Sequence, residues 1–154
     1  MRLVFAPRAA LLLAAAALAG GCGAEEEPIP FACVNGSAEA VERALADAPG
    51  AVVLEGGTSI SACIRTARSD AELQNAGGIL TTAAEHLELE APADATAALQ
   101  LGYLVGAARR GASKENGIQA ELVRRLERSA ALEAPTPAAK AALAKGLEAG
   151  EQRG

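Results

Sequence analysis

Aromatic residues are almost absent from this 154-residue sequence, which contains two Phe, one Tyr and no Trp. After the first 21 residues only Phe31 and Tyr103 remain. A core without aromatic side chains has to be built from Ala, Leu, Val and Ile, and each buried Ala contributes little apolar area. Because Ala favours helix and lets helices approach closely, this composition favours a small all-α domain with tight helix contacts.

Candidate catalytic groups are also scarce. The one histidine, His86, stands one helical turn before Glu90, where the two could share a cation; an exposed histidine beside carboxylates is the plainer interpretation. Ser59 and Ser61 lie in GGTSIS, which lacks the G-x-S-x-G arrangement of a nucleophile. No general base is evident for either serine. The sequence therefore predicts a protein that is not an enzyme and holds neither a metal nor a cofactor.

Basic side chains are fewer than acidic ones in this sequence. The chain carries 14 Lys and Arg against 19 Asp and Glu, a net charge of −5. Arg2 and Arg8 lie in the first 21 residues, so a chain without that segment has a net charge of −7. Nucleic-acid-binding proteins carry a basic stripe, and peripheral docking on anionic lipid headgroups needs basic clusters. We therefore expect neither kind of partner.

The N-terminal apolar run is too short for a permanent transmembrane helix, which needs roughly 20 residues. A basic segment at 1–10 precedes an uninterrupted Ala and Leu stretch at 11–19, and Gly20-Gly21 follow. A basic start, a short apolar stretch and a small-residue end are typical of a secretory signal peptide. We assign residues 1–21 to this signal and expect no transmembrane helix in the mature chain.

The segment LAGGC, residues 18–22, resembles the lipobox of bacterial lipoprotein precursors. The resemblance covers the N-terminal segment alone. It implies cleavage before Cys22, attachment of diacylglycerol to the Cys22 thiol and anchoring through acyl chains such as palmitate. Where the lipobox favours a large aliphatic residue, three positions before the cysteine, this sequence has Ala19. Residues 17–19 also offer an A-x-A site for ordinary cleavage, which would release a soluble protein.

Cysteine is rare, and an odd count of three needs a separate explanation in an exported chain. If Cys22 carries lipid, Cys33 and Cys63 remain as a matched pair whose disulfide closes a loop of 30 residues. Two buried free thiols or a metal pair are the alternatives, although two cysteines with one distant histidine make a poor zinc site. We predict the Cys33–Cys63 disulfide.

The mature chain divides into a tether, one domain and a tail. Residues 22–30 are acidic and interrupted by proline, so they cannot bury apolar area and should form a flexible, extended tether. Residues 31–150 are predicted to form one all-α bundle of four to five helices, and 151–154 a disordered tail. Apolar runs at 31–34 and 51–54 could pair as short strands or lie as buried extended segments. Helix starts are expected at Ser37, Ser69, Asp94 and Thr136.

The segment 94–111 is the most informative helix. It is apolar on nearly all sides between 97 and 108, so we expect a buried central helix that Gly111 ends in the left-handed conformation. Small residues recur every four positions along it and make a groove against which another helix can lie closely. These small residues are Ala98, Gly102 and Gly106.

The function predicted first is a non-catalytic interaction or envelope-accessory module, lipid-anchored to the extracytoplasmic face of a bacterial membrane, with an envelope protein as candidate partner. Its working surface is expected at the small-residue groove and on a basic face. The alternative is that the domain fills its own groove and that the arginines are ordinary surface. The basic face consists of Arg109, Arg110, Arg124, Arg125 and Arg128.

Two further functions stay open. A small-ligand or lipid-binding lipoprotein would use a cavity between helices and would show an apolar pocket of a few hundred cubic ångströms. A hydrolytic enzyme would need Ser59, Ser61 or His86 to meet a carboxylate inside a cleft.

Overall fold

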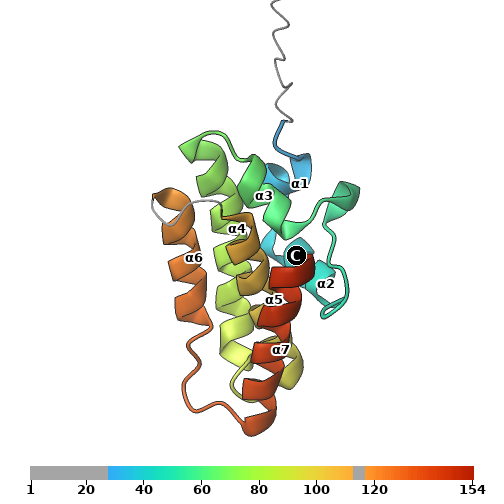
Figure 1. Cartoon of the computed structure of the whole chain (residues 1–154), viewed down its shortest axis with the longest axis vertical. Helices are drawn as coiled ribbons and strands as arrows, with labels where there is room; N and C mark the ends of the chain where they lie inside the picture. The colour runs from blue at the N-terminus through green and yellow to red at the C-terminus, as the bar shows by residue number, and fades with distance from the viewer. Residues whose placement is uncertain (1–27, 113–116) are drawn as a thin grey trace, which may run out of the picture.

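The computed structural model describes residues 28–112 and 117–154, and all regular secondary structure within these ranges is helical (Figure 1). The helices are α1 (Phe31–Asn35), α2 (Ala38–Leu45), α3 (Ile60–Thr66), α4 (Asp70–Glu90), α5 (Ala95–Gly111), α6 (Ile118–Ser129) and α7 (Pro137–Arg153), with a short 3₁₀ turn η1 (Glu55–Gly57). The long helices α4 to α7 run along the length of the molecule, and α1 and α3 lie near one end (Figure 1). The all-α prediction is confirmed.

The predicted number of four to five helices is too low, since the described residues form seven. A helix start at Ser37 was expected, so the surplus comes mainly from the shorter helices α1 and α3, of five and seven residues. Isolated helices of this length are unstable in water, so packing against the long helices has to hold them. The sequence pattern underestimates such elements because they show only one or two turns of periodicity.

The apolar runs at 31–34 and 51–54 do not pair as strands, and for the second run the alternative of a buried extended segment holds. The first run lies in α1, and the second is an extended connection whose Val52 is buried. The Val52 amide donates to the Tyr103 hydroxyl at 3.2 Å instead of joining a ladder. Leu54 donates to the Thr58 carbonyl at 2.8 Å across a turn. Short apolar runs do not distinguish strand from buried helix or buried coil.

Helix α4 starts after its N-cap Ser69, as predicted, and its first turn is a capping box formed with Glu72. The Ser69 hydroxyl accepts from the Glu72 amide, and the Glu72 carboxylate accepts from the Ser69 amide, both at 3.2 Å. The same carboxylate accepts from the Arg68 amide at 2.8 Å. The hydrogen bonds from Arg68 and then Ser69 lower the pKa of Glu72. These contacts satisfy backbone donors that the first helical turn leaves without partners.

Helix α5 is the central element, as predicted. It packs against α2, α3, α4, α6 and α7, and its side chains are buried along most of its length. The predicted left-handed stop at Gly111 is wrong, because Gly111 is the last helical residue and is buried. A Cβ atom there would lie 2.5 Å from the Ser61 carbonyl oxygen. Gly111 thus permits a close α3–α5 contact.

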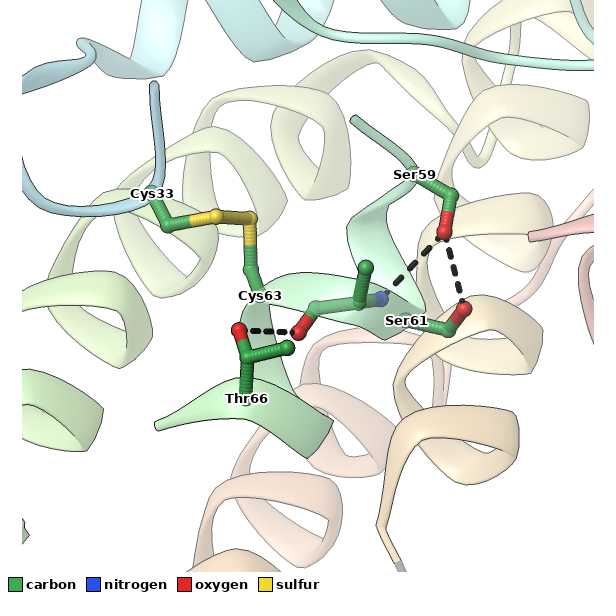
Figure 2. Close-up of a disulfide and its surroundings, with 6 residues drawn as sticks. Cys33, Ser59, Ser61, Cys63 and Thr66 are labelled. Carbon is green, nitrogen blue, oxygen red and sulfur yellow. Dashed lines mark hydrogen bonds between the residues drawn. A yellow bond between two sulfur atoms is a disulfide. The ribbon is translucent and has the colours of Figure 1, made fainter. Parts of the chain in front are cut away.

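The Cys33–Cys63 disulfide is confirmed. It joins α1 to α3 with 5.3 Å between the Cα atoms, and both cysteines are almost fully buried (Figure 2). Because α1 spans only five residues, this cross-link is important for holding it against α3. The disulfide thus connects the first helix of the described residues to the core.

The N-terminal predictions lie outside the described residues. These are the signal peptide at 1–21, the lipid attachment at Cys22 and the tether up to residue 27. Within the part of the chain that the structure describes, no helix combines the length and the apolar character needed to cross a membrane.

Candidate functional site

The groove predicted along the small residues of α5 is occupied by α7. Gly146 and Gly150 of α7 face Gly102 and Gly106 of α5, so no side chain separates the two backbones there. A Cβ atom on Gly102 would lie 2.1 Å from a backbone oxygen of α7, and one on Gly150 would lie 2.1 Å from a backbone oxygen of α5. Of the two alternatives for this surface, the structure shows the second: the domain fills its own groove, and Gly102 and Gly106 are buried.

Arg109 belongs to a junction of three helices and is not a free basic side chain. Its Nε donates to Glu127 of α6 at 2.8 Å, and its Nη1 donates to Glu151 of α7 at 3.0 Å. Partial burial alone would lower the pKa of Arg109, but the hydrogen bonds with Glu151 and Glu127 raise it. The Arg109 guanidinium therefore stays charged and links α5, α6 and α7.

Arg110 holds the last turn of α7. Its Nη1 donates to the backbone carbonyls of Glu151 and Gln152, at 3.0 and 2.7 Å. The predicted disordered tail at 151–154 is wrong, since α7 remains helical to Arg153. Cations suit the negative end of a helix, and here the cation comes from the end of the neighbouring helix α5.

The three arginines of α6 are more exposed and more weakly paired. Arg124 lies 3.2 Å from Glu121, and Arg128 lies 3.6 Å from the same carboxylate. Arg125 lies 3.8 Å from Glu85 of α4. Exposed ion pairs of this kind contribute little stability, so these guanidinium groups are free to reorient.

A groove of about 280 Å³ lies between α4 and α6. On the α4 side it is formed around Gly77 and Gly78, with Leu73, Gln74 and Thr81 beside them. A Cβ atom on Gly77 would already lie 3.3 Å from Leu122 of α6, whereas one on Gly78 would meet nothing within 4 Å. The missing side chain at Gly78 therefore leaves open space in the groove wall.

The α6 side of the groove is mainly apolar near the start of the helix, where Glu121 stands between two apolar residues, and basic further along. Ile118 and Leu122 lie nearest the start of α6, and Glu121, Arg125 and Arg128 complete the lining. Leu122 is also part of the hydrophobic core. The groove thus joins an apolar wall that is continuous with the core to a charged rim.

A second hollow of about 450 Å³ adjoins this groove, because both are lined by Leu73 and Ile118. It lies where α4 and α6 begin. Its other walls are mainly polar and come from Ala67, Arg68, Ser69, Asp70, Gly117 and Gln119. Of these two adjoining hollows, the α4–α6 groove is therefore the more apolar one.

No family model matches this chain. No curated protein and no solved structure is significantly similar to it either. Its chemistry therefore has to be inferred from its own residues.

The two serines considered as nucleophiles take structural roles at the start of α3. The Ser59 hydroxyl accepts from the Ala62 amide at 3.3 Å and lies 3.1 Å from the Ser61 hydroxyl (Figure 2). Ser61 is buried and donates to the backbone carbonyl of Gly154. Among the described residues, no Asp or Glu side chain is hydrogen-bonded to either serine, and Thr66 beside them donates to the Ala62 carbonyl. These hydroxyls cap α3 and join it to the end of α7.

His86 pairs with a carboxylate, but not with the Glu90 suggested by the helical spacing. Its Nδ1 lies 2.7 Å from Glu42 of α2, on an exposed face. In the described residues no group of three or more His, Cys, Asp or Glu side chains is placed to hold a metal ion. The His86–Glu42 contact joins α2 to α4 at the surface.

Of the residues predicted for the working surface, Arg125 and Arg128 line the α4–α6 groove, and Arg124 does not. Gly102 and Gly106 are buried, and Arg109 and Arg110 bind α7. The sequence signal for this groove was the Gly77-Gly78 pair inside a strong helical pattern. That pair is compatible with a close contact or a bend, and the structure shows a close contact at Gly77 and open space at Gly78.

Proposed function

We propose that this protein is a bacterial lipoprotein, anchored through Cys22 to the extracytoplasmic face of a membrane, with a helical domain that acts as a non-catalytic interaction module. The order of the segments supports this proposal. A signal-like segment at 1–21 precedes Cys22, an acidic tether follows, and helix α1 begins at Phe31. Acyl chains supply the membrane affinity, at roughly 0.8 kcal/mol for each buried methylene.

The observation that carries the proposal is the disulfide. Cys33 and Cys63 are bonded to each other, so two of the three cysteines are accounted for and Cys22 is left for another role. Disulfides persist mainly in oxidising compartments outside the cytoplasm, which favours an exported chain. A cysteine directly after a signal-like segment is the position at which lipoproteins carry their lipid.

The first prediction concerns the mass of the mature protein. Protein purified from its own host is expected to begin at Cys22, to be heavier by its acyl groups and lighter by the hydrogens lost in one disulfide. Intact mass spectrometry before and after reduction measures both changes. The Cys22→Ala variant is the control and should carry no lipid. A lipid-free protein that begins at Gly20 would contradict the anchor and would make Cys22 a free or intermolecular thiol.

A second candidate function is the binding of a small apolar ligand, and the α4–α6 groove favours it. Its volume of about 280 Å³ lies near the lower end of small-molecule sites, which run from about 300 Å³ upward. Apolar walls from Leu73, Ile118 and Leu122 surround the space left open at Gly78. Such a groove would let a lipid-anchored domain bind a ligand without catalysis.

The second prediction tests this groove with an uncharged probe. N-phenyl-1-naphthylamine, which fluoresces when it leaves water, is expected to bind the protein. The Gly78→Leu substitution should lower its affinity at least tenfold. The Cβ atom of the new leucine would meet nothing within 4 Å, so its side chain can extend into the space that Gly78 leaves open in the groove. Gly78→Ala is the matched control, because it makes the same backbone change and fills little space. Equal probe binding by the Gly78→Leu variant would rule this groove out as the ligand site.

A further inference from the structure

The α4–α6 groove has a different chemistry at its two ends. Leu73, Ile118 and Leu122 line the part nearest the starts of both helices. Arg125 and Arg128 lie one to two turns further along α6 and form the rim there. An apolar channel that ends at two guanidinium groups is complementary to a ligand with an aliphatic body and an anionic head.

The two arginines are available for a ligand. Their side chains are 59% and 67% exposed, and their nearest carboxylates lie 3.8 and 3.6 Å away. Glu121, which also lines the groove, is the partner of Arg128 but is closer to Arg124, at 3.2 Å. Arg124 therefore balances the negative charge of Glu121 at the rim. An incoming anion could replace these long contacts with bidentate hydrogen bonds to Arg125 and Arg128.

The size of the groove selects among aliphatic ligands. A helix, about 10–12 Å across with its side chains, does not fit a hollow of about 280 Å³. If a methylene group fills about as much space as a water molecule, roughly 30 Å³, the groove holds a chain of on the order of nine or ten carbons. A phospholipid with two long acyl chains exceeds this volume.

We propose that the α4–α6 groove binds one straight-chain carboxylate of about ten carbons, with its chain over Gly78 and its head between Arg125 and Arg128. This proposal rests on the second candidate function, the binding of a small apolar ligand, and adds the charge and length of that ligand. The carboxylate is a free monomeric fatty acid and not the headgroup of a lipid in a bilayer. The buried Thr81 and the neighbouring Gln74 supply polar groups along the α4 wall.

The test is isothermal titration calorimetry with decanoate, decanol and decyltrimethylammonium, which share a chain and differ in charge. The protein is the full mature chain with Cys22→Ser, so that no acyl group or detergent competes. The chain should bind one decanoate, at least tenfold more tightly than decyltrimethylammonium. Gly78→Leu should weaken decanoate binding at least tenfold. The double variant Arg125→Gln/Arg128→Gln should do the same and leave decanol binding within twofold.

Arg43→Gln is the matched control, because it removes the same charge from an exposed helix position, but Arg43 lies on α2 and does not line the groove. It should change decanoate affinity less than twofold. Equal weakening by Arg43→Gln, or equal binding of decanoate and decyltrimethylammonium, would overturn the proposed head-group site. If decanol binding is lost on Gly78→Leu while the arginine variants bind decanoate normally, the apolar ligand site stands and the anionic specificity fails. If none of the three probes binds, both the apolar ligand site and its anionic specificity are overturned.

Discussion

Replacing Gly146 with alanine is expected to destabilise the domain by about 2 to 3 kcal/mol, as overpacking of a tight contact does. The new Cβ atom would lie 2.0 Å from the Leu99 backbone oxygen and 2.9 Å from the Tyr103 amide nitrogen. Both neighbours are backbone atoms of α5, so no side chain can turn aside. Helices α5 and α7 would have to separate along their contact. Urea unfolding followed by circular dichroism measures the change.

The sign of this effect distinguishes packing from helix propensity. Glycine to alanine inside a helix normally gains about 1 kcal/mol, so propensity alone predicts that the Gly146→Ala variant is more stable. Gly78→Ala is the control for the effect of helix propensity, because its Cβ atom meets nothing within 4 Å. It should stabilise the domain by up to about 1 kcal/mol. A Gly146→Ala variant as stable as the native chain would mean that α7 does not pack on α5 through these glycines.

Removing the disulfide with Cys33→Ala and Cys63→Ala is expected to lower the free energy of unfolding by about 3 to 4 kcal/mol. The bond closes a loop with a sequence separation of 30 residues, and the chain-entropy relation assigns this magnitude to such a loop. The loss should be visible locally as well. Helix α1 is too short to persist alone, so release from α3 should expose it to proteases. Phe31, already 71% exposed, offers chymotrypsin a cleavage site there.

Reduction of the native protein provides the matched measurement. Dithiothreitol should lower the stability of the native chain to about that of the double variant and leave the double variant unchanged. Limited chymotrypsin digestion should then cut both near Phe31 and spare the long helices. If the double variant unfolds at the same urea concentration as the native chain, the disulfide does not brace this light core.

Glycine has opposite consequences on two sides of the same domain. On α5 and α7 it removes side chains from a contact that is then filled by backbone, which locks two helices together. On α4 the side chain is missing at Gly78 and nothing replaces it, which leaves part of a groove. The small residues of α5 that were expected to form a working surface are therefore structural, and Gly78 of α4 borders the candidate groove.

Local patterns in the sequence were sufficient for several features. Ser69 and Glu72 predicted the start of α4, because a capping box uses contacts within one turn. The apolar surface all round 97–108 predicted a buried α5, since no face of it could remain in water. Composition predicted an all-α domain, and the count of three cysteines led to the Cys33–Cys63 pair.

Tertiary structure alone decided which helix meets which. The spacing of Gly102 and Gly106 shows that a close partner fits, but not that the partner is α7 from the same chain. Arg109 and Arg125 were both predicted to belong to one basic face. In the structure Arg109 binds two carboxylates of neighbouring helices, whereas Arg125 lines a groove. These outcomes depend on contacts between residues far apart in the chain. A periodic pattern determines the face that a residue occupies and carries no information about what covers that face.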